Sequence, residues 1–213
     1  VNNNDIKDIS ALTKYKKIVS LDLSNNKNIE SYEPLKILFK RENTSIQNAL
    51  DNINKNMLNS IIKKYTDDDK NEEDDSSEDE VQDDDFELYP TYKSLNLSNC
   101  NISDLSMFDD FDLSFLDLSN NNITSIDELK LEDLIDLNLS NNKLENADLT
   151  NLFNYNIENL YLNNTGLTSL KIDKNIKKDF IATLDLSNND ITDISLLNNI
   201  KNIDILSLEN NKN

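Results

Sequence analysis

The chain has 213 residues, a length that fits one domain or one domain with an appendage. It carries 41 acidic and 21 basic residues, and the net charge of −20 disfavours nucleic acid and anionic membrane surfaces as partners. With no His, one Cys and one Gly, the sequence excludes a His-based catalytic triad, a His metal site, an internal disulfide and a glycine-rich phosphate loop.

The first residues contain half of a repeated unit. VNNNDIKDIS (1–10) aligns with LSNNDITDIS (186–195), so Val1 takes the place of a strand leucine. This polar start does not resemble a signal peptide, and no apolar run reaches the roughly 18 residues of a membrane helix, so we expect no membrane insertion. We expect the repeat array to be cut at this end, and also at the other, because the chain stops just after the turn residue Asn211.

A nine-residue segment, first seen as IVSLDLSNN at 18–26, occurs seven times along the chain. The first leucine of its L-x-L motif falls at positions 21, 95, 116, 137, 160, 184 and 206. After an initial gap of 74 residues, the period is 21 to 24 residues. This period and the pattern L-x-x-L-x-L-x-x-[N/C/T] are those of leucine-rich repeats.

The pattern indicates how the repeats stack. Alternation in x-L-x-L-x has a period of two, which predicts a short strand with its leucines on one face. One repeat cannot bury that face alone, so neighbours stack and share a core. A side chain at the following turn satisfies buried backbone groups, and we expect this ladder at Asn26, Cys100, Asn121, Asn142, Thr165, Asn189 and Asn211.

A second pattern follows each strand. Apolar residues spaced as I-x-x-I-x-x-[L/F] at 6–12, 102–108, 123–129 and 191–197 predict a tight turn or a 3₁₀ segment on the convex side. With a period near 22, the chain resembles the leucine-rich repeats of bacterial internalins and of the regulatory subunit of type-1 protein phosphatase. The resemblance implies an α/β solenoid with short parallel strands on its concave face.

The long first gap predicts an insertion at 40–90 between repeats at 1–39 and repeats at 91–213. Within it, apolar residues every three or four positions predict an amphipathic helix over 44–65. These apolar residues are Ile46, Leu50, Ile53, Met57, Ile61 and Tyr65. The helix either packs on the flank of the solenoid or forms a partner helix or coiled-coil seam.

The rest of the insertion is an acidic tract at 67–85, with 13 acidic residues in 19. Such a run cannot bury apolar area, so we expect disorder. Ser76 and Ser77 each precede an acidic residue by three positions and are candidate phosphorylation sites. The tract is either a solvated spacer or a regulated tail that meets a basic partner.

The outward-facing strand positions are the candidate binding surface. Phe115 and Tyr161 are aromatic residues beside acids, which is typical of interface anchors, although they could also only cover their neighbours. A metal-binding or catalytic carboxylate pair at Asp117 is disfavoured because no apolar pocket is expected there. The predicted partner-binding residues are Asp22, Asn96, Phe115, Asp117, Asn138, Tyr161 and Asp185.

These features favour a protein-interaction module that binds a partly basic protein surface, with no enzymatic activity, cofactor or metal. Three roles stay open: an intracellular scaffold or regulator, including a phosphatase regulator; an internalin-like surface adhesin; and a non-catalytic domain of a larger enzyme. Glycosylation of the sequons at Asn96 and Asn138 would block the binding face. This favours the cytoplasm, or a bacterium, over a eukaryotic secretory route. The cell surface or secretion stays the alternative if a signal peptide lies outside this sequence.

Overall fold

The computed structural model describes residues 4–15, 18–40 and 92–211. The stretches on both sides of the gap belong to one compact unit. The predicted insertion at 40–90 lies outside the described residues except for Lys40, which forms an antiparallel bridge with Phe111. Its helix at 44–65, its acidic tract at 67–85 and Ser76 and Ser77 therefore remain predictions.

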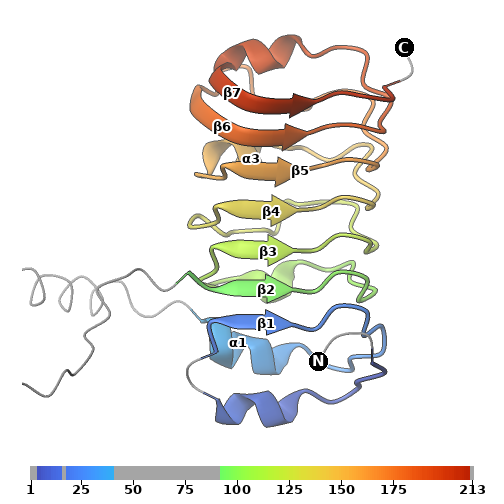
Figure 1. Cartoon of the computed structure of the whole chain (residues 1–213), viewed down its shortest axis with the longest axis vertical. Helices are drawn as coiled ribbons and strands as arrows, with labels where there is room; N and C mark the ends of the chain where they lie inside the picture. The colour runs from blue at the N-terminus through green and yellow to red at the C-terminus, as the bar shows by residue number, and fades with distance from the viewer. Residues whose placement is uncertain (1–3, 16–17, 41–91, 212–213) are drawn as a thin grey trace, which may run out of the picture. The chain divides into compact units, whose positions relative to one another are not determined.

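Seven parallel strands form one sheet in chain order (Figure 1). The strands are β1 (Ser20–Asp22), β2 (Ser94–Asn96), β3 (Phe115–Asp117), β4 (Asp136–Asn138), β5 (Asn159–Tyr161), β6 (Lys178–Asp185) and β7 (Ile200–Ser207). The predicted leucine register is confirmed, because Leu21, Leu95, Leu116, Leu137, Leu160, Leu184 and Leu206 stand opposite one another. The fold is a leucine-rich-repeat solenoid.

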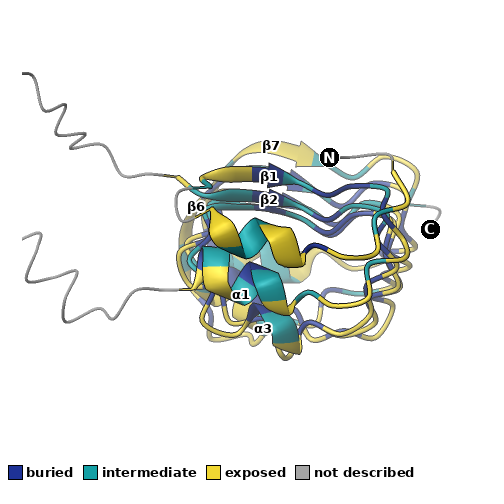
Figure 2. Ribbon diagram, turned by 90° about the horizontal axis from the view of Figure 1, so that it is seen from below, coloured by how far each residue is buried: buried dark blue, intermediate teal, exposed yellow. Residues whose placement is uncertain are grey.

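Short helices and turns lie on the side opposite the sheet (Figure 2). They are η1 (Ser10–Lys14), α1 (Glu33–Phe39), η2 (Ser106–Phe108), α3 (Thr150–Asn154) and η3 (Ser195–Asn199). The 3₁₀ segments expected within 6–12, 102–108 and 191–197 are present, whereas 123–129 contains only a turn. Pro34 stands in the first turn of α1, where its missing N–H has no helical acceptor to lose.

An aromatic cluster joins the repeats on either side of the gap. Phe39 stacks on Phe111 with ring centroids 6.2 Å apart, and Phe108 meets Phe111 edge-on at 5.4 Å. All three side chains are buried. The backbone N–H of Asp112 also donates to the carbonyl of Phe39 at 2.6 Å. The core is therefore continuous although 51 residues separate the two stretches in the chain.

The last two strands are longer than the repeat pattern predicts. Strands β6 and β7 each have eight residues, whereas each of the other five has three. The additional pairing joins Lys178 to Ile200 and Phe180 to Asn202. The segments that precede the L-x-L motif are rich in β-branched and aromatic residues here, which favours extended backbone.

Candidate functional site

We define the strand face as the side of the sheet that bears the outward side chains of β1–β7. All seven predicted partner-binding residues lie on it, and each has an intermediate exposure. Six of them form the central column of the face: five are Asp or Asn, and the sixth is Tyr161, the last residue of β5. Phe115 stands one outward position earlier, on β3.

The Asp and Asn side chains of this column have a local structural role. In each case Oδ1 accepts the backbone N–H of the residue two positions later, at 2.8–3.1 Å. The pairs are Asp22 with Ser24, Asn96 with Ser98, Asp117 with Ser119, Asn138 with Ser140 and Asp185 with Ser187. Each bond closes the turn that follows the strand, in the manner of an Asx-turn.

This local role explains why Asp and Asn alternate in the column. Both side chains offer an Oδ1 acceptor, so either residue can close the turn. The carboxylates of Asp117 and Asp185 keep a second oxygen and a negative charge, and neither side chain is buried. The column therefore presents charge at some repeats and neutral amides at others on the same backbone geometry.

The strand face also carries an aromatic pair that the sequence pattern did not identify. The ring of Tyr92 meets that of Phe115 edge-on, with centroids 5.8 Å apart, and Tyr92 is 54% exposed. The repeat pattern does not single out Tyr92, because Tyr92 aligns with the core residues Leu113 and Leu134 and is therefore expected to be buried. The available signal was an aromatic hydroxyl in a column otherwise filled by aliphatic residues.

Polar side chains connect neighbouring strands along this face. The hydroxyl of Ser94 donates to that of Ser20 at 2.8 Å, and the amide of Asn159 donates to a carboxylate oxygen of Asp136 at 2.6 Å. At the end of the face, Ile205 is 60% exposed. The surface is therefore polar and pre-ordered, with apolar groups at a few strands.

The ladder is confirmed as a buried hydrogen-bonding column. The amide of Asn121 donates to the carbonyls of Leu97 and Leu118, both at 2.9 Å. Its Oδ1 accepts the N–H groups of Cys100 and Ile102 at 3.0 and 2.9 Å. The amide also reaches the carbonyl of Ser119 at 3.2 Å, so one side chain serves five backbone groups in two repeats.

Cys100 fills a ladder position as a structural residue. Its thiol donates to the carbonyl of Leu23 at 3.1 Å, and burial raises its pKa, which disfavours the thiolate. The hydroxyl of Tyr32 donates to the carbonyl of Cys100 at 3.2 Å, and burial, with the nearby Cys100, raises the pKa of Tyr32. Both the Cys100 thiol and the Tyr32 hydroxyl therefore stay protonated near neutral pH.

A second asparagine column precedes the ladder at each turn. Its members are Asn25, Asn99, Asn120, Asn141, Asn164, Asn188 and Asn210, and all have φ between 54° and 60°. Asparagine is the non-glycine residue that best tolerates this left-handed region. Neighbouring members also bond to each other, as Asn99 does to Asn25 at 2.7 Å and Asn210 to Asn188 at 2.9 Å.

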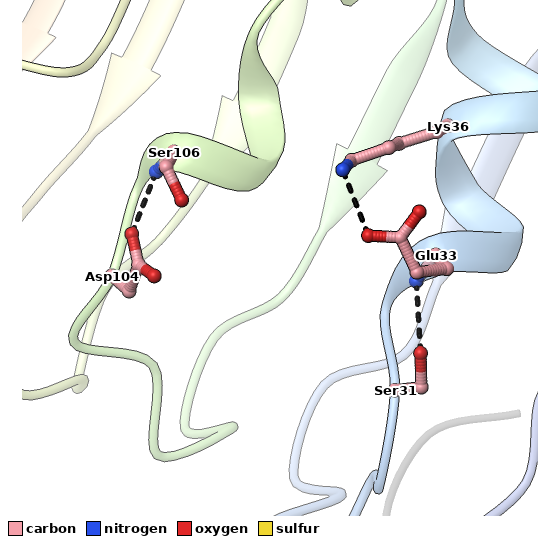
Figure 3. Close-up of polar contacts among 5 residues, drawn as sticks. All are labelled: Ser31, Glu33, Lys36, Asp104 and Ser106. Carbon is pink, nitrogen blue, oxygen red and sulfur yellow. Dashed lines mark hydrogen bonds and ion pairs between the residues drawn. The ribbon is translucent and has the colours of Figure 1, made fainter.

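A shallow hollow of about 310 Å³ lies between α1 and the η2 segment, opposite the strand face. Figure 3 shows its polar groups bonding within their own turns. Asp104 accepts the N–H of Ser106 at 2.8 Å, Lys36 pairs with Glu33 at 2.8 Å, and Ser31 accepts the N–H of Glu33 at 3.2 Å. These groups maintain the turns and do not converge on a ligand.

The described part of the chain contains no group of three or more Cys, Asp or Glu side chains arranged to hold a metal ion. Over the same residues, no helix has the length and apolar character needed to cross a bilayer.

Comparison with solved structures identifies the same fold. The chain superposes on an internalin (inlF) from Listeria monocytogenes with a TM-score of 0.52 and 21% identity, over 95% of this chain and 51% of the internalin. The chain thus spans about half the length of that protein. A second match, an internalin C2 (inlC2) from the same bacterium, is 20% identical. The match covers 53% of this chain and 70% of the internalin C2 chain, with a TM-score of only 0.25. No protein-family model and no curated protein matches the sequence.

Proposed function

We propose that the chain is a protein-interaction module and that its strand face binds a protein partner. The observation that carries this proposal is the pair formed by Tyr92 and Phe115, in which an exposed aromatic ring is held by a second ring on a rigid sheet. Aromatic groups of this kind supply most of the binding free energy at protein interfaces.

The acids of the central column support a partner with basic groups. Asp117 stands on the same strand as Phe115, so a carboxylate lies close to the aromatic pair. A cationic side chain of the partner would gain from both the carboxylate and the aromatic faces. The predicted residues Asp22, Asn96, Asn138, Tyr161 and Asp185 extend this surface along the sheet.

The test compares three variants in affinity capture from extract, with bound proteins read by mass spectrometry. Tyr92→Ser/Phe115→Ser should lose most of the captured proteins, because interface aromatics typically cost about 2 kcal/mol or more when truncated. Ile37→Ser is the matched control, since Ile37 is 67% exposed on α1, opposite the strand face. Asp117→Asn/Asp185→Asn keeps the turn acceptors and removes two charges, so it should weaken capture mainly at low salt.

The inserted helix is the competing binding element. If the aromatic variant kept its partners while deletion of 43–66 abolished capture, the helix would bind and the solenoid would only present it. Circular dichroism of each variant separates lost binding from lost folding.

The sequons at Asn96 and Asn138 support a cytoplasmic location. Both side chains stand on the strand face and hold a turn through Oδ1, so a glycan on Nδ2 would cover the proposed interface. Expression through a secretory route that glycosylates these sites should abolish partner capture. Glycosylated protein with unchanged capture would contradict both this location argument and the proposed face.

A further inference from the structure

The fifth repeat breaks the turn pattern of the central column. In five of the first six repeats, an Asp or Asn side chain in this column accepts the backbone N–H two residues later. Tyr161 takes this position in β5, and its only side-chain oxygen lies at the far end of the ring. The N–H of Asn163 therefore has no acceptor among the described residues. Ser207 in the seventh repeat also forms no such bond within the described part of the chain, but it places no aromatic ring beside its turn.

The backbone around Asn163 keeps the geometry of the other turns. Its carbonyl accepts the N–H of Asn141 at 3.0 Å, and the N–H of Leu162 donates to the carbonyl of Asp185 at 2.8 Å. Asn164 has the left-handed φ of 54° that its counterparts share. The N–H of Asn163 therefore points to the place where an Asp or Asn oxygen lies in the other repeats. Asn163 has an intermediate exposure, so an acceptor from water or from a partner can reach this N–H.

The stability of the turn does not explain a tyrosine at this position. Loss of the acceptor weakens the turn, as the loss of a side-chain cap does elsewhere. The ring of Tyr161 gains little burial in return, because the residue has an intermediate exposure. Local rules of this kind are broken mainly at functional sites. A half-exposed aromatic ring beside an open donor therefore indicates a binding position.

Carboxylates near the open N–H determine the charge of what binds there. Asp185 is the register partner of Tyr161 on β6, and Asp136 on β4 accepts the amide of Asn159. Among the described residues, neither carboxylate forms an ion pair. An anionic acceptor would be repelled by both. The acceptor that fits the N–H is therefore a neutral carbonyl, and the side chain that fits beside it is cationic.

We propose that Tyr161, Asn163 and Asp185 form a subsite, the β5 subsite, for a peptide segment of the partner that carries a basic residue. A backbone carbonyl of this segment accepts the Asn163 N–H and replaces the side-chain oxygen of the other turns. The cationic group lies against the Tyr161 ring and pairs with the Asp185 carboxylate. Arginine is preferred over lysine, because its planar guanidinium both stacks on a ring and bonds a carboxylate. The β5 subsite rests on the proposed function of the strand face and adds the chemistry of the bound residue.

Hydrogen exchange followed by NMR tests the open donor in the free protein. The Asn163 amide should exchange at least about tenfold faster than that of Ser98, a residue of similar exposure whose N–H is held by Asn96 at 2.9 Å. Tyr161→Asn supplies the missing Oδ1, so it should slow exchange at Asn163 and raise the melting temperature by a few degrees. Tyr161→Ala removes the ring without adding an acceptor, so exchange should stay fast. Equal protection of the Asn163 and Ser98 amides in the wild type would overturn the proposal.

Titration with a blocked peptide tests the binding chemistry. The peptide acetyl-Gly-Gly-Arg-Gly-Gly-amide should shift the Asn163 amide resonance of the wild type until the site is saturated. The same peptide with citrulline keeps every carbonyl and loses the charge, so it should bind about 3- to 30-fold more weakly. Tyr161→Asn should abolish the shift, whereas Ile37→Ser, on the opposite side of the solenoid, should match the wild type. Equal affinity for the arginine and citrulline peptides, or equal binding by the wild type and Tyr161→Asn, would contradict the β5 subsite.

The result is separable from that of the strand-face test. Tyr92→Ser/Phe115→Ser leaves the β5 subsite in place, so this variant should still bind the arginine peptide while it loses captured proteins. Capture that survives this double variant but is lost in Tyr161→Asn would support the β5 subsite and contradict the role of the aromatic pair. Absence of peptide binding, with capture that still depends on Tyr92 and Phe115, would overturn the β5 subsite and leave the proposed face.

Discussion

At the residue scale, side-chain amides and carboxylates carry out backbone hydrogen bonding at three places in the repeat. They close the turn after the strand, occupy the left-handed position and form the buried ladder. Eight asparagines among the described residues have positive φ, a conformation that costs most other residues about 1 kcal/mol or more. The abundance of asparagine thus has a physical reason at these positions.

The ladder should be the most sensitive polar column. Asn121→Ala removes the partner of three buried backbone groups, the N–H groups of Cys100 and Ile102 and the carbonyl of Leu97, whereas the carbonyl of Leu118 keeps the Asn142 amide. Since each such group costs about 1–3 kcal/mol, we expect a loss of at least about 3 kcal/mol in the free energy of unfolding, measured by urea denaturation. Asn122→Ala is the neighbouring control, because Asn122 is exposed and its side-chain amide bonds to another side chain, that of Asn101. Equal losses in both variants would refute the assignment.

The central column should distinguish a lost acceptor from a lost charge. Asp117→Asn keeps the Oδ1 that accepts the Ser119 N–H, and we expect unfolding free energy within about 0.5 kcal/mol of the wild type. Asp117→Ala removes the acceptor and should cost about 1 kcal/mol, as at other side-chain caps. Denaturant titrations of the two variants measure both free energies of unfolding. If Asp117→Asn were destabilised as much as Asp117→Ala, the charge of Asp117, and not its acceptor, would be what stabilises the fold.

Acid should weaken the turns opposite the strand face. Each of four aspartates accepts hydrogen bonds from the residue two positions later, and these bonds lower its pKa. For Asp8, Asp104 and Asp193 the main cause is the backbone N–H of the following Ser. For Asp148 it is the hydroxyl of Thr150. Because the folded pKa lies below the usual 3.8, these bonds stabilise the fold above that pH. Their contribution is lost as pH falls through the lowered values. A variant with all four of these aspartates replaced by Asn should therefore show a smaller fall in melting temperature than the wild type when the pH drops below about 4.

At the element scale, the helices depend on packing. The helix α1 has seven residues and α3 has five, which is too short for stability in isolation. Each buries two side chains: Leu35 and Phe39 in α1, and Leu152 and Phe153 in α3. Burial of these groups, rather than intrinsic helix propensity, holds the segments in place.

A pair of variants on one helix tests this dependence. Phe39→Ala should cost about 3–5 kcal/mol in unfolding free energy, because the ring is fully buried against Phe111. Ile37→Ala on the exposed side of α1 should change stability by no more than about 0.5 kcal/mol. Chemical denaturation of both variants provides the comparison. Similar losses would mean that helix propensity, and not the aromatic cluster, holds α1.

At the scale of the whole molecule, each repeat is stabilised mainly by its neighbours. Every strand pairs with the adjacent strand in one register, and the ladder bonds cross the same interfaces. Stability is then close to a sum of nearest-neighbour terms. The net charge, in contrast to the stability, is concentrated in one segment: the acidic tract at 67–85 accounts for −12 of the net −20.

Deleting that tract should have little effect on folding at physiological salt. Removal of 13 acidic residues and one lysine leaves a net charge of −8. Exposed like charges contribute little when screened, so we expect a melting temperature within a few degrees of the wild type, and a small rise at low salt. Thermal scans at two salt concentrations measure this. A large drop would show that the tract packs against folded structure.

The sequence by itself determined the repeat architecture. The L-x-L period set the strand register, and the turn pattern identified ladder residues such as Asn121 and Cys100, because both signals are local and recur at every repeat. The same repetition placed the seven candidate binding residues on one face. It did not reveal that Asp117 and Asp185 also close turns, since that requires the path of the following backbone.

Only the tertiary structure decided which repeated positions are covered. Tyr92 occupies a column of aliphatic residues that are buried or partly buried, and Leu206 a column of buried leucines, yet both are exposed. Phe39 and Phe111 are distant in sequence but pack together across the gap. Burial depends on what lies beside a residue in space, and a periodic sequence assigns the same expectation to every copy. The contact across the gap and the exposure of Tyr92 and Leu206 therefore had to be observed in three dimensions.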